Sequence, residues 1–215
     1  RYPLIHHRFH LRLEIDNLDA YDIAADMIEK GLIHEISFMD HSPGQGQFKN
    51  LAIYRTALAK YNGMTEEEYD FEGFLEREKH KKMLSFAQLR ELARLAHSHG
   101  IAVASHDDDT REKLDLNREI GVDISEFPIT IPAAQYAKSL GFYTVVGAPN
   151  ILRGGSHSGN MSAAEAVQAG FADILCSDYY PPAILHGVFL LHSKYGLPLP
   201  EVVRKATRNP ALAVG

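Results

Sequence analysis

Residues 101–109 read IAVASHDDD, a short apolar segment that runs into a histidine and three aspartates. Gly100 precedes it and ends a long stretch of helical character, so the apolar run starts a new element. A run of this length and composition is typical of a buried strand in a parallel sheet. The sequence therefore predicts a strand over 101–105, with His106 and Asp107 at its carboxyl end.

The same alternation of strand and helix extends in both directions from this segment. Strand character is found at 9–15, 35–39, 122–128, 142–150 and 172–182, and helical character at 19–30, about 50–99, 110–119, 131–140, 162–170 and in two segments after 181. Strands separated by helices predict βαβ units and a mainly parallel sheet. The chain has neither a G-x-G-x-x-G sequence after its first strand nor a P-loop, so no nucleotide-binding motif is expected.

Residues able to bind a divalent cation stand at the ends of four predicted strands. They are Glu14, His41, His106 and Asp178. In a parallel barrel all such ends lie on one rim, where active sites form. The alternation of side chains supports this placement, because His10, Arg12 and Glu14 share one face of their strand, as do Ile174, Cys176 and Asp178. We therefore expect these four residues to be metal ligands.

The residue types also indicate which metal and which chemistry to expect. Imidazole and carboxylate ligands together suit Zn, Mn or Fe, as one or two ions. Such a centre lowers the pKa of a bound water to about 7, and Asp178 is a candidate to take the proton. Two other interpretations stay open: a lone histidine at a strand end can be an ordinary loop residue, and Asp107 to Asp109 can cap the next helix instead of lining the rim.

A second candidate site is the segment GAPNILRGGSHSGN at 147–160. Glycines such as Gly154 and Gly155 allow a backbone to approach an anion closely, and Arg153 offers two parallel hydrogen bonds to phosphate. His157 and Asn160 add hydrogen-bonding groups. A flexible surface loop is the alternative, but beside a metal rim the segment predicts a site for a phosphorylated substrate.

Bulk properties narrow the class of protein. The 215 residues are 45% hydrophobic and 23% charged, with a formal charge of −6, which suits one globular domain over 1–215 and argues against a nucleic-acid partner. No run of about 18 apolar residues is present, so no membrane segment is expected. The single cysteine, Cys176, suits a reducing compartment, and we expect a cytoplasmic protein.

The motifs MDHSPGQGQF, ASHDDDT, GAPNILRGGSHSGN and ILCSDYYPP resemble those of an amidohydrolase-superfamily enzyme family of phosphonate utilisation, the PhnM type. The resemblance covers essentially all 215 residues. It implies a TIM-like (β/α) barrel of the metal-dependent hydrolase type. It also implies a diphosphatase that converts α-D-ribose 1-methylphosphonate 5-triphosphate, a small phosphorylated sugar, to the 5-phosphate and pyrophosphate. Glu14 would end the fourth strand of the barrel and Asp178 the eighth.

The chain departs from the superfamily pattern at both ends. The H-x-H pair of a first strand is not found in that context, because His6 and His7 are adjacent and His97-Ser98-His99 lies at a helix end. The usual continuation into a small β-sandwich is also not seen. We therefore expect a partial barrel that lacks its first strands and the sandwich, with a possible homo-oligomeric state.

Two further readings of the function remain. One is a deaminase or cyclic amidase that uses the same rim, which would need no phosphate-binding segment. The other is a catalytically incomplete piece that acts only in assembly and would need no metal.

Overall fold

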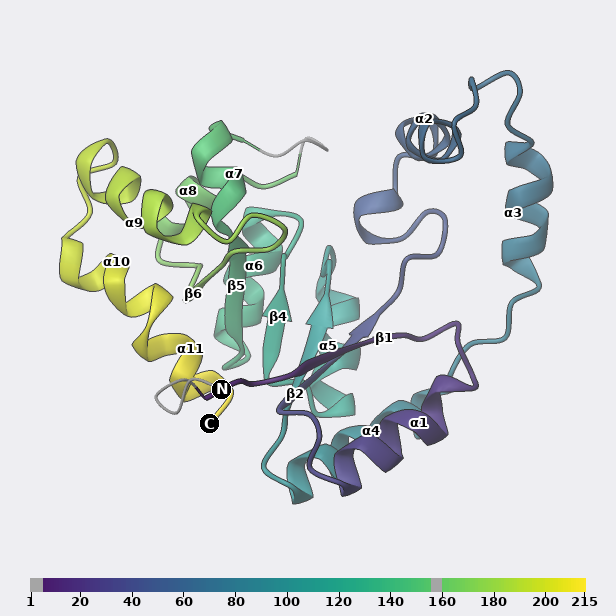
Figure 1. Ribbon diagram of the computed structural model, residues 1–215, viewed down its shortest axis with the longest axis horizontal. Coiled ribbons are helices and arrows are strands. Elements are labelled where there is room, and N and C mark those ends of the chain that lie inside the picture. Colours follow the sequence, from purple (N-terminus) through teal and green to yellow (C-terminus); the bar gives the residue numbers. More distant parts are fainter. Residues whose placement is uncertain (1–5, 156–159) are drawn as a thin grey trace.

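The computed structural model of the chain describes residues 6–155 and 160–215. Within them six parallel strands form one sheet in sequence order. The strands are β1 (His10–Glu14), β2 (Glu35–Met39), β3 (Ala102–His106), β4 (Ile124–Glu126), β5 (Tyr143–Gly147) and β6 (Ile174–Cys176). Figure 1 shows them side by side, with β1 and β6 at opposite edges. The predicted parallel sheet is confirmed.

The order of the strands differs from that of a doubly wound parallel sheet. Every strand pairs with its neighbours in sequence, whereas a doubly wound sheet reverses its order at a switch point. The arrangement is thus wound in one direction, as in a barrel. Among the described residues β1 and β6 each pair with a single strand, so the sheet has two edges.

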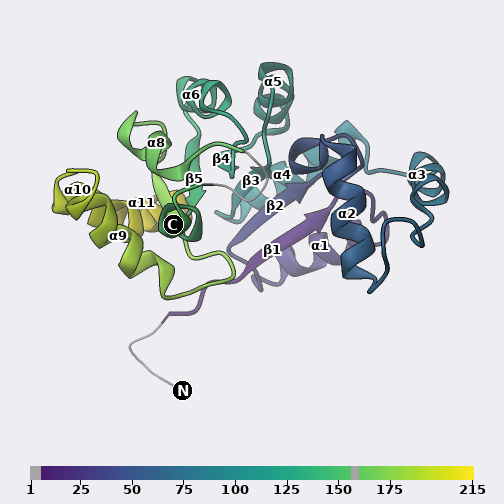
Figure 2. The same cartoon turned by 90° about the horizontal axis from the view of Figure 1, so that it is seen from above.

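Helices connect the strands and flank the sheet. They are α1 (Ala20–Glu29), α2 (Leu51–Tyr61), α3 (Phe71–Lys79), α4 (Phe86–Ser98), α5 (Arg111–Ile120), α6 (Ile131–Ser139), α7 (Ala148–Arg153), α8 (Ala163–Gln168), α9 (Ala183–Ser193), α10 (Leu199–Ala206) and α11 (Arg208–Ala213), with a 3₁₀ turn at Gly46–Phe48. In Figure 2, α4, α5 and α6 follow one another around one face of the sheet. Several begin at a side-chain cap, including α8, where the Ser162 hydroxyl accepts from the Glu165 amide.

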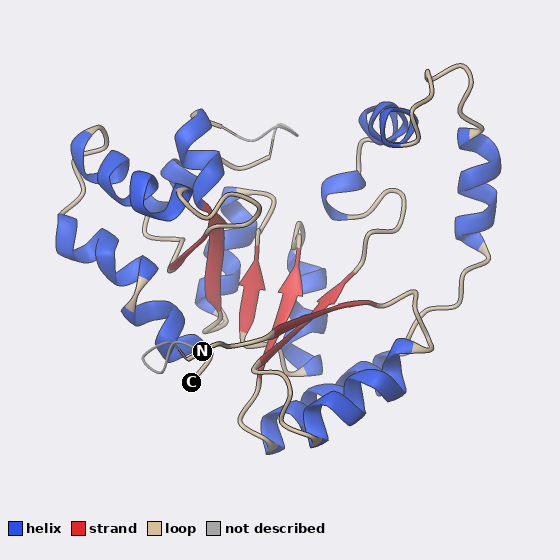
Figure 3. Ribbon diagram, in the orientation of Figure 1, coloured by secondary structure: helices blue, strands red, loops and turns tan. Residues whose placement is uncertain are grey.

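The two faces of the sheet differ as the alternation predicted. Leu13, Ile36 and Val103 are buried in one cluster with residues of α1 and α4. Ala102 and Ala104 lie on the opposite face, in a cluster that Ala213 and Val214 cover near the carboxyl end of the chain. Figure 3 shows the strands as one twisted layer with helices around it. The face with the small side chains is the one that carries His10, Arg12 and Glu14.

The segment 50–99 is mostly helical, as predicted, and is divided into α2, α3 and α4; Figure 1 shows α2 and α3 set apart from the sheet. One segment differs from the sequence prediction. The strand predicted over 142–150 ends at Gly147, and helix α7 takes up the first half of the predicted glycine-rich loop. Pro149 in the first turn and Gly154 in a left-handed conformation at the end explain this short helix.

A buried carboxylate joins the ends of β3 and β4. Asp108 is fully buried and accepts hydrogen bonds from Ser105 Oγ at 2.6 Å, Ser125 Oγ at 2.5 Å and Asn117 Nδ2 at 2.7 Å. Because its oxygens are satisfied from three elements, the turn after β3 is held in one position. This turn presents the neighbouring Asp107 to the site described below.

Among the described residues, no helix combines the length and the apolar character that a membrane crossing requires.

Candidate metal centre and adjoining pocket

Three buried polar atoms meet at the carboxyl end of the sheet without hydrogen-bond partners. They are His41 Nε2, His106 Nδ1 and Asp107 Oδ2. The ligand atoms that these residues offer lie within 4.8 Å of one another. Leaving a buried polar group unsatisfied costs about 1–3 kcal/mol, so a ligand that all three atoms can share would stabilise this arrangement.

The contacts within this group favour a cation as that ligand. His41 Nε2 lies 3.8 Å from Asp107 Oδ2, and His106 Nδ1 lies 3.2 Å from the same oxygen. The second distance is short, but the atoms lack hydrogen-bond geometry. Two imidazoles and a carboxylate match the ligand preference of Zn²⁺ and related divalent ions. The donor set therefore fits a divalent metal ion.

Glu14 orients one of these imidazoles. The His41 Nδ1 group donates to Glu14 Oε1 at 2.7 Å, which leaves the lone pair of Nε2 directed toward Asp107. A histidine that binds a metal usually donates its other ring N–H group to a carboxylate in this way. Glu14 thus lies beside the group through His41, although the sequence predicted that it would ligate the metal directly.

Arg12 occupies the other side of His106. Its Nη2 donates to His106 Nε2 at 3.0 Å, and its Nε lies 3.1 Å from Met39 Sδ. Since a guanidinium can only donate, His106 carries its own proton on Nδ1 in this state. Binding a cation through Nδ1 requires that proton to leave and Arg12 to release Nε2.

Backbone conformation explains how adjacent residues can serve one site. Side chains of neighbouring strand residues point to opposite faces, so His106 and Asp107 would normally diverge. Asp107 has φ of 54°, in the left-handed region, which redirects its side chain toward His106. Phe127, directly beyond β4, and Asp178, two residues beyond β6, have φ of 53° and 50°. Such strain in residues other than glycine is typical of functional sites.

A glycine makes room for Asp107. A Cβ atom at Gly46 would lie 2.8 Å from Asp107 Cβ and 3.2 Å from its carbonyl oxygen. Gly46 therefore lets the turn after β2 pack directly on the aspartate. No pattern in the sequence predicted this role for a glycine of MDHSPGQGQF.

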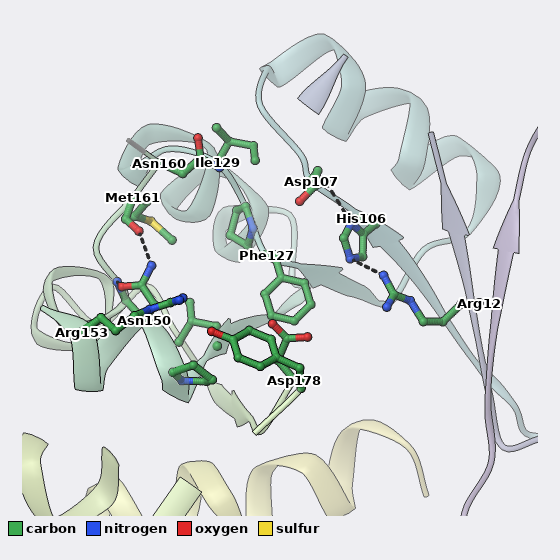
Figure 4. Close-up of a pocket in the computed structure, with 16 residues that line it drawn as sticks. Arg12, His106, Asp107, Phe127, Ile129, Asn150, Arg153, Asn160, Met161 and Asp178 are labelled. Carbon is green, nitrogen blue, oxygen red and sulfur yellow. Dashed lines mark hydrogen bonds and ion pairs between the residues drawn. The ribbon is translucent and has the colours of Figure 1, made fainter. Parts of the chain in front are cut away.

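A cavity of about 390 Å³ adjoins the group. His106 and Asp107 line one wall, and Arg153, Asp178 and Tyr179 line another. Figure 4 shows Arg12 with His106 on the one side and Arg153 with Asn150 on the other. A cavity of this size can hold a small phosphorylated molecule.

The predicted phosphate segment contributes side chains to this cavity. Arg153 and Asn160 both line it, and the Arg153 guanidinium lies 5.7 Å from the centre of the Tyr179 ring. Asn150 positions the far end of the segment, because it donates to Met161 O at 3.2 Å and accepts from the Ala163 amide at 2.9 Å.

The backbone of the same segment differs from the prediction. The Gly154 and Gly155 amides donate to the carbonyls of Ile151 and Asn150, so they close helix α7 and do not form an anion nest. His157 lies outside the described residues.

The four predicted ligands therefore take different places. His41 and His106 come together, Glu14 contacts His41, and Asp178 lines the cavity outside the group of His41, His106 and Asp107. The sequence prediction left Asp107 undecided and gave Arg12 no role. Arg12 shares a strand face with His10 and Glu14, and this pattern in the sequence could have indicated that Arg12 lies at the site.

Replacement of Glu14 by glutamine should weaken cation binding about 10- to 100-fold, because His41 loses the charged partner that fixes its tautomer. The dissociation constant for Zn²⁺ can be measured by competition with a chromogenic chelator. Glu112→Gln, on the exposed face of α5, is the control and should bind as the wild type does. Equal affinity in the Glu14 and Glu112 variants would show that Glu14 does not support the site.

A matched pair of glycines tests the packing on Asp107. Gly46→Ala should reduce Zn²⁺ affinity about tenfold or more, since the new methyl group must displace the Asp107 turn. Gly44→Ala meets nothing within 4 Å and has φ of 86°, so it carries backbone strain without this clash. The same competition assay distinguishes them, and indistinguishable affinities would contradict the proposed contact.

The sequence of the chain was compared with protein-family models and with curated proteins. No protein-family model matches the chain. It is 36% identical over 212 residues to the alpha-D-ribose 1-methylphosphonate 5-triphosphate diphosphatase of Escherichia coli K12. The match covers 97% of this chain and 55% of that enzyme, so the chain spans about half the length of its curated relative.

Solved structures show the same fold at much lower sequence identity. The ochratoxinase of A. niger aligns with a TM-score of 0.56 at 15% identity, covering 93% of this chain and 44% of that protein. A prolidase crystallised with N-methylphosphonate-L-proline aligns with a TM-score of 0.52 at 16% identity, covering 93% and 47%.

The strand order bears on the strand numbers that the resemblance implied. Six consecutive strands run from Glu14 to Asp178, so if Asp178 follows an eighth strand, Glu14 ends the third and not the fourth. The resemblance inferred from the motifs is confirmed in this sense: over about half of its length, the diphosphatase of phosphonate utilisation is a homologue of this chain.

Proposed function

We propose that this chain carries the metal centre and phosphate site of a metal-dependent hydrolase that cleaves a phosphoric anhydride. The substrate would be α-D-ribose 1-methylphosphonate 5-triphosphate, and the products the 5-phosphate and pyrophosphate. One observation carries the proposal: a single cavity has residues that could hold a cation on one wall and Arg153 on another. The name of the 36% identical relative supports the choice of substrate.

His41, His106 and Asp107 would hold the cation, with Glu14 orienting His41. A divalent ion at such a site supplies a water of lowered pKa and stabilises charge on phosphoryl oxygens. Zn, Mn and Fe all suit these ligands, as one or two ions. A direct ligand role for Glu14 and Asp178 stays part of the proposal, because both lie at the same rim.

The remaining residues would bind the substrate and move a proton. Arg153 can hold a phosphate oxygen pair, and Asn160 can donate a further hydrogen bond from the same wall. Arg12, once released from His106, is a second guanidinium beside the cavity. Asp178 lines the cavity and can accept the proton of the attacking water.

The setting of the site is also part of the proposal. The six-stranded sheet would form most of a closed (β/α) barrel, next to a small β-sandwich, as in the superfamily to which its relatives belong. We propose a cytoplasmic enzyme with a small-molecule substrate, no nucleic-acid or membrane partner and a possible homo-oligomeric state.

The decisive experiment measures pyrophosphate release from a ribose 5-triphosphate in the presence of Mn²⁺ or Zn²⁺. The protein tested is the complete gene product that contains these 215 residues. Asp178→Asn should lower kcat by about 10²- to 10⁴-fold, because the proton acceptor is lost. Arg153→Ala should lower kcat/KM by at least about tenfold, as one charged hydrogen-bonding partner is removed, while Arg118→Ala on the exposed surface of α5 should have no effect.

Absence of pyrophosphate release with either metal would reject the diphosphatase. Hydrolysis of a cyclic amide by the same protein would then favour the amidase reading. Full activity of Asp178→Asn would remove that residue from the mechanism without affecting the metal centre.

A further inference from the structure

A second group of side chains that could bind a metal lies on the same face of the sheet. It is farther from the rim than the first group, beyond Arg12 in the direction of the start of β1. It consists of His10 on β1, Glu35 on β2 and Glu126 on β4, whose ligand atoms lie within 4.8 Å of one another. His10 Nδ1 is 3.6 Å from Glu35 Oε2, and His10 Nε2 is 3.8 Å from Glu126 Oε2. None of the three belongs to the group at His41, His106 and Asp107.

The side chain of Glu126 is an independent indication that this group can bind a ligand. Its residue is only 7% exposed, and its Oε2 has no hydrogen-bond partner. That oxygen faces the His10 imidazole, whose Nε2 contacts Ser37 Oγ at 2.8 Å. A buried carboxylate oxygen left in this state is costly unless a cation or proton accompanies it.

The sheet leaves room for these side chains to meet. β3 lies between β2 and β4, and on this face it carries Ala102 and Ala104. Because these side chains are short, Glu126 can reach across β3 toward His10 and Glu35. A larger residue at either alanine would fill the space.

In the absence of a cation, burial favours the neutral form of all three groups, so a cation would displace protons from the two carboxyl groups. Burial raises the pKa of Glu126 to about 8, with Glu35 contributing, and burial raises the pKa of Glu35 to about 7. The pKa of His10 falls to about 4, first through burial and then through Arg12 and His106. The imidazole is therefore neutral at pH 7 and keeps a lone pair for a metal.

We propose that His10, Glu35 and Glu126 bind a divalent transition-metal cation at a site separate from the group at the rim. One imidazole and two carboxylates suit Mn²⁺ or Zn²⁺. Bound there, the ion would tie β1, β2 and β4 together across β3. It would also add positive charge next to Arg12, which lies between the two groups.

The test measures the number of bound cations and needs no activity. Equilibrium dialysis of the full chain against Mn²⁺, followed by elemental analysis, should give two bound ions per chain. Glu126→Gln should lose one of them and keep the other, because it removes the charge while preserving shape. His41→Ala should lose the other ion, and the double variant should lose both.

Circular dichroism and thermal melting establish that each variant is folded. If Glu126→Gln does not fold, the half-buried Glu35→Gln replaces it, with the same expected loss of one ion. Glu112→Gln, on the surface of α5, should retain both. A single ion in the wild type that Glu126→Gln retains, or retention of both ions by folded Glu126→Gln and Glu35→Gln, would overturn the proposal. So would loss of both ions in either variant, since the two groups would then not be separate sites.

Discussion

Two buried imidazole nitrogens and a buried carboxylate oxygen lie close together without hydrogen-bond partners. The backbone and packing of the surrounding turns hold these three atoms in place. His41 Nε2, His106 Nδ1 and Asp107 Oδ2 have given up hydration without gaining protein partners. Three such groups at about 1–3 kcal/mol each represent a sizeable fraction of the stability of a domain. A divalent cation bound between the three atoms would replace this cost with favourable ligand bonds.

Several local features serve this one contact. The parallel register brings the ends of β2 and β3 together, and the left-handed Asp107 turns its side chain to the side of His106. Gly46 leaves space against Asp107, and buried Asp108 holds the turn in place. Each feature taken alone looks like an ordinary loop or cap. Together they position one oxygen atom.

Sequence periodicity predicted the sheet, the faces of its strands and the meeting of His41 with His106, because a period of two and the common rim of parallel strands determine these directly. It could not place Asp107, since alternation alone sends adjacent residues to opposite faces, and only the left-handed φ reverses this. The helix at 148–153 was missed because the glycines around 154 suggested a loop, whereas Gly154 ends a helix. Direct ligation by Glu14 and Asp178 remains a prediction.

The face of the sheet that carries the site has two groups of residues that could bind a metal, one at the rim and one farther from it, with Arg12 between them. Its guanidinium donates to His106, which makes Arg12 sensitive to whether that imidazole holds a metal. The group at the rim adjoins the cavity that Arg153 and Asp178 line, and the proposed ion at His10, Glu35 and Glu126 would join β1, β2 and β4. The most direct test of the metal centre is anomalous X-ray scattering from crystals of the protein grown with Zn²⁺. We predict a peak about 2.0–2.2 Å from His41 Nε2, His106 Nδ1 and Asp107 Oδ2. A density map without anomalous signal between these three atoms would contradict the account.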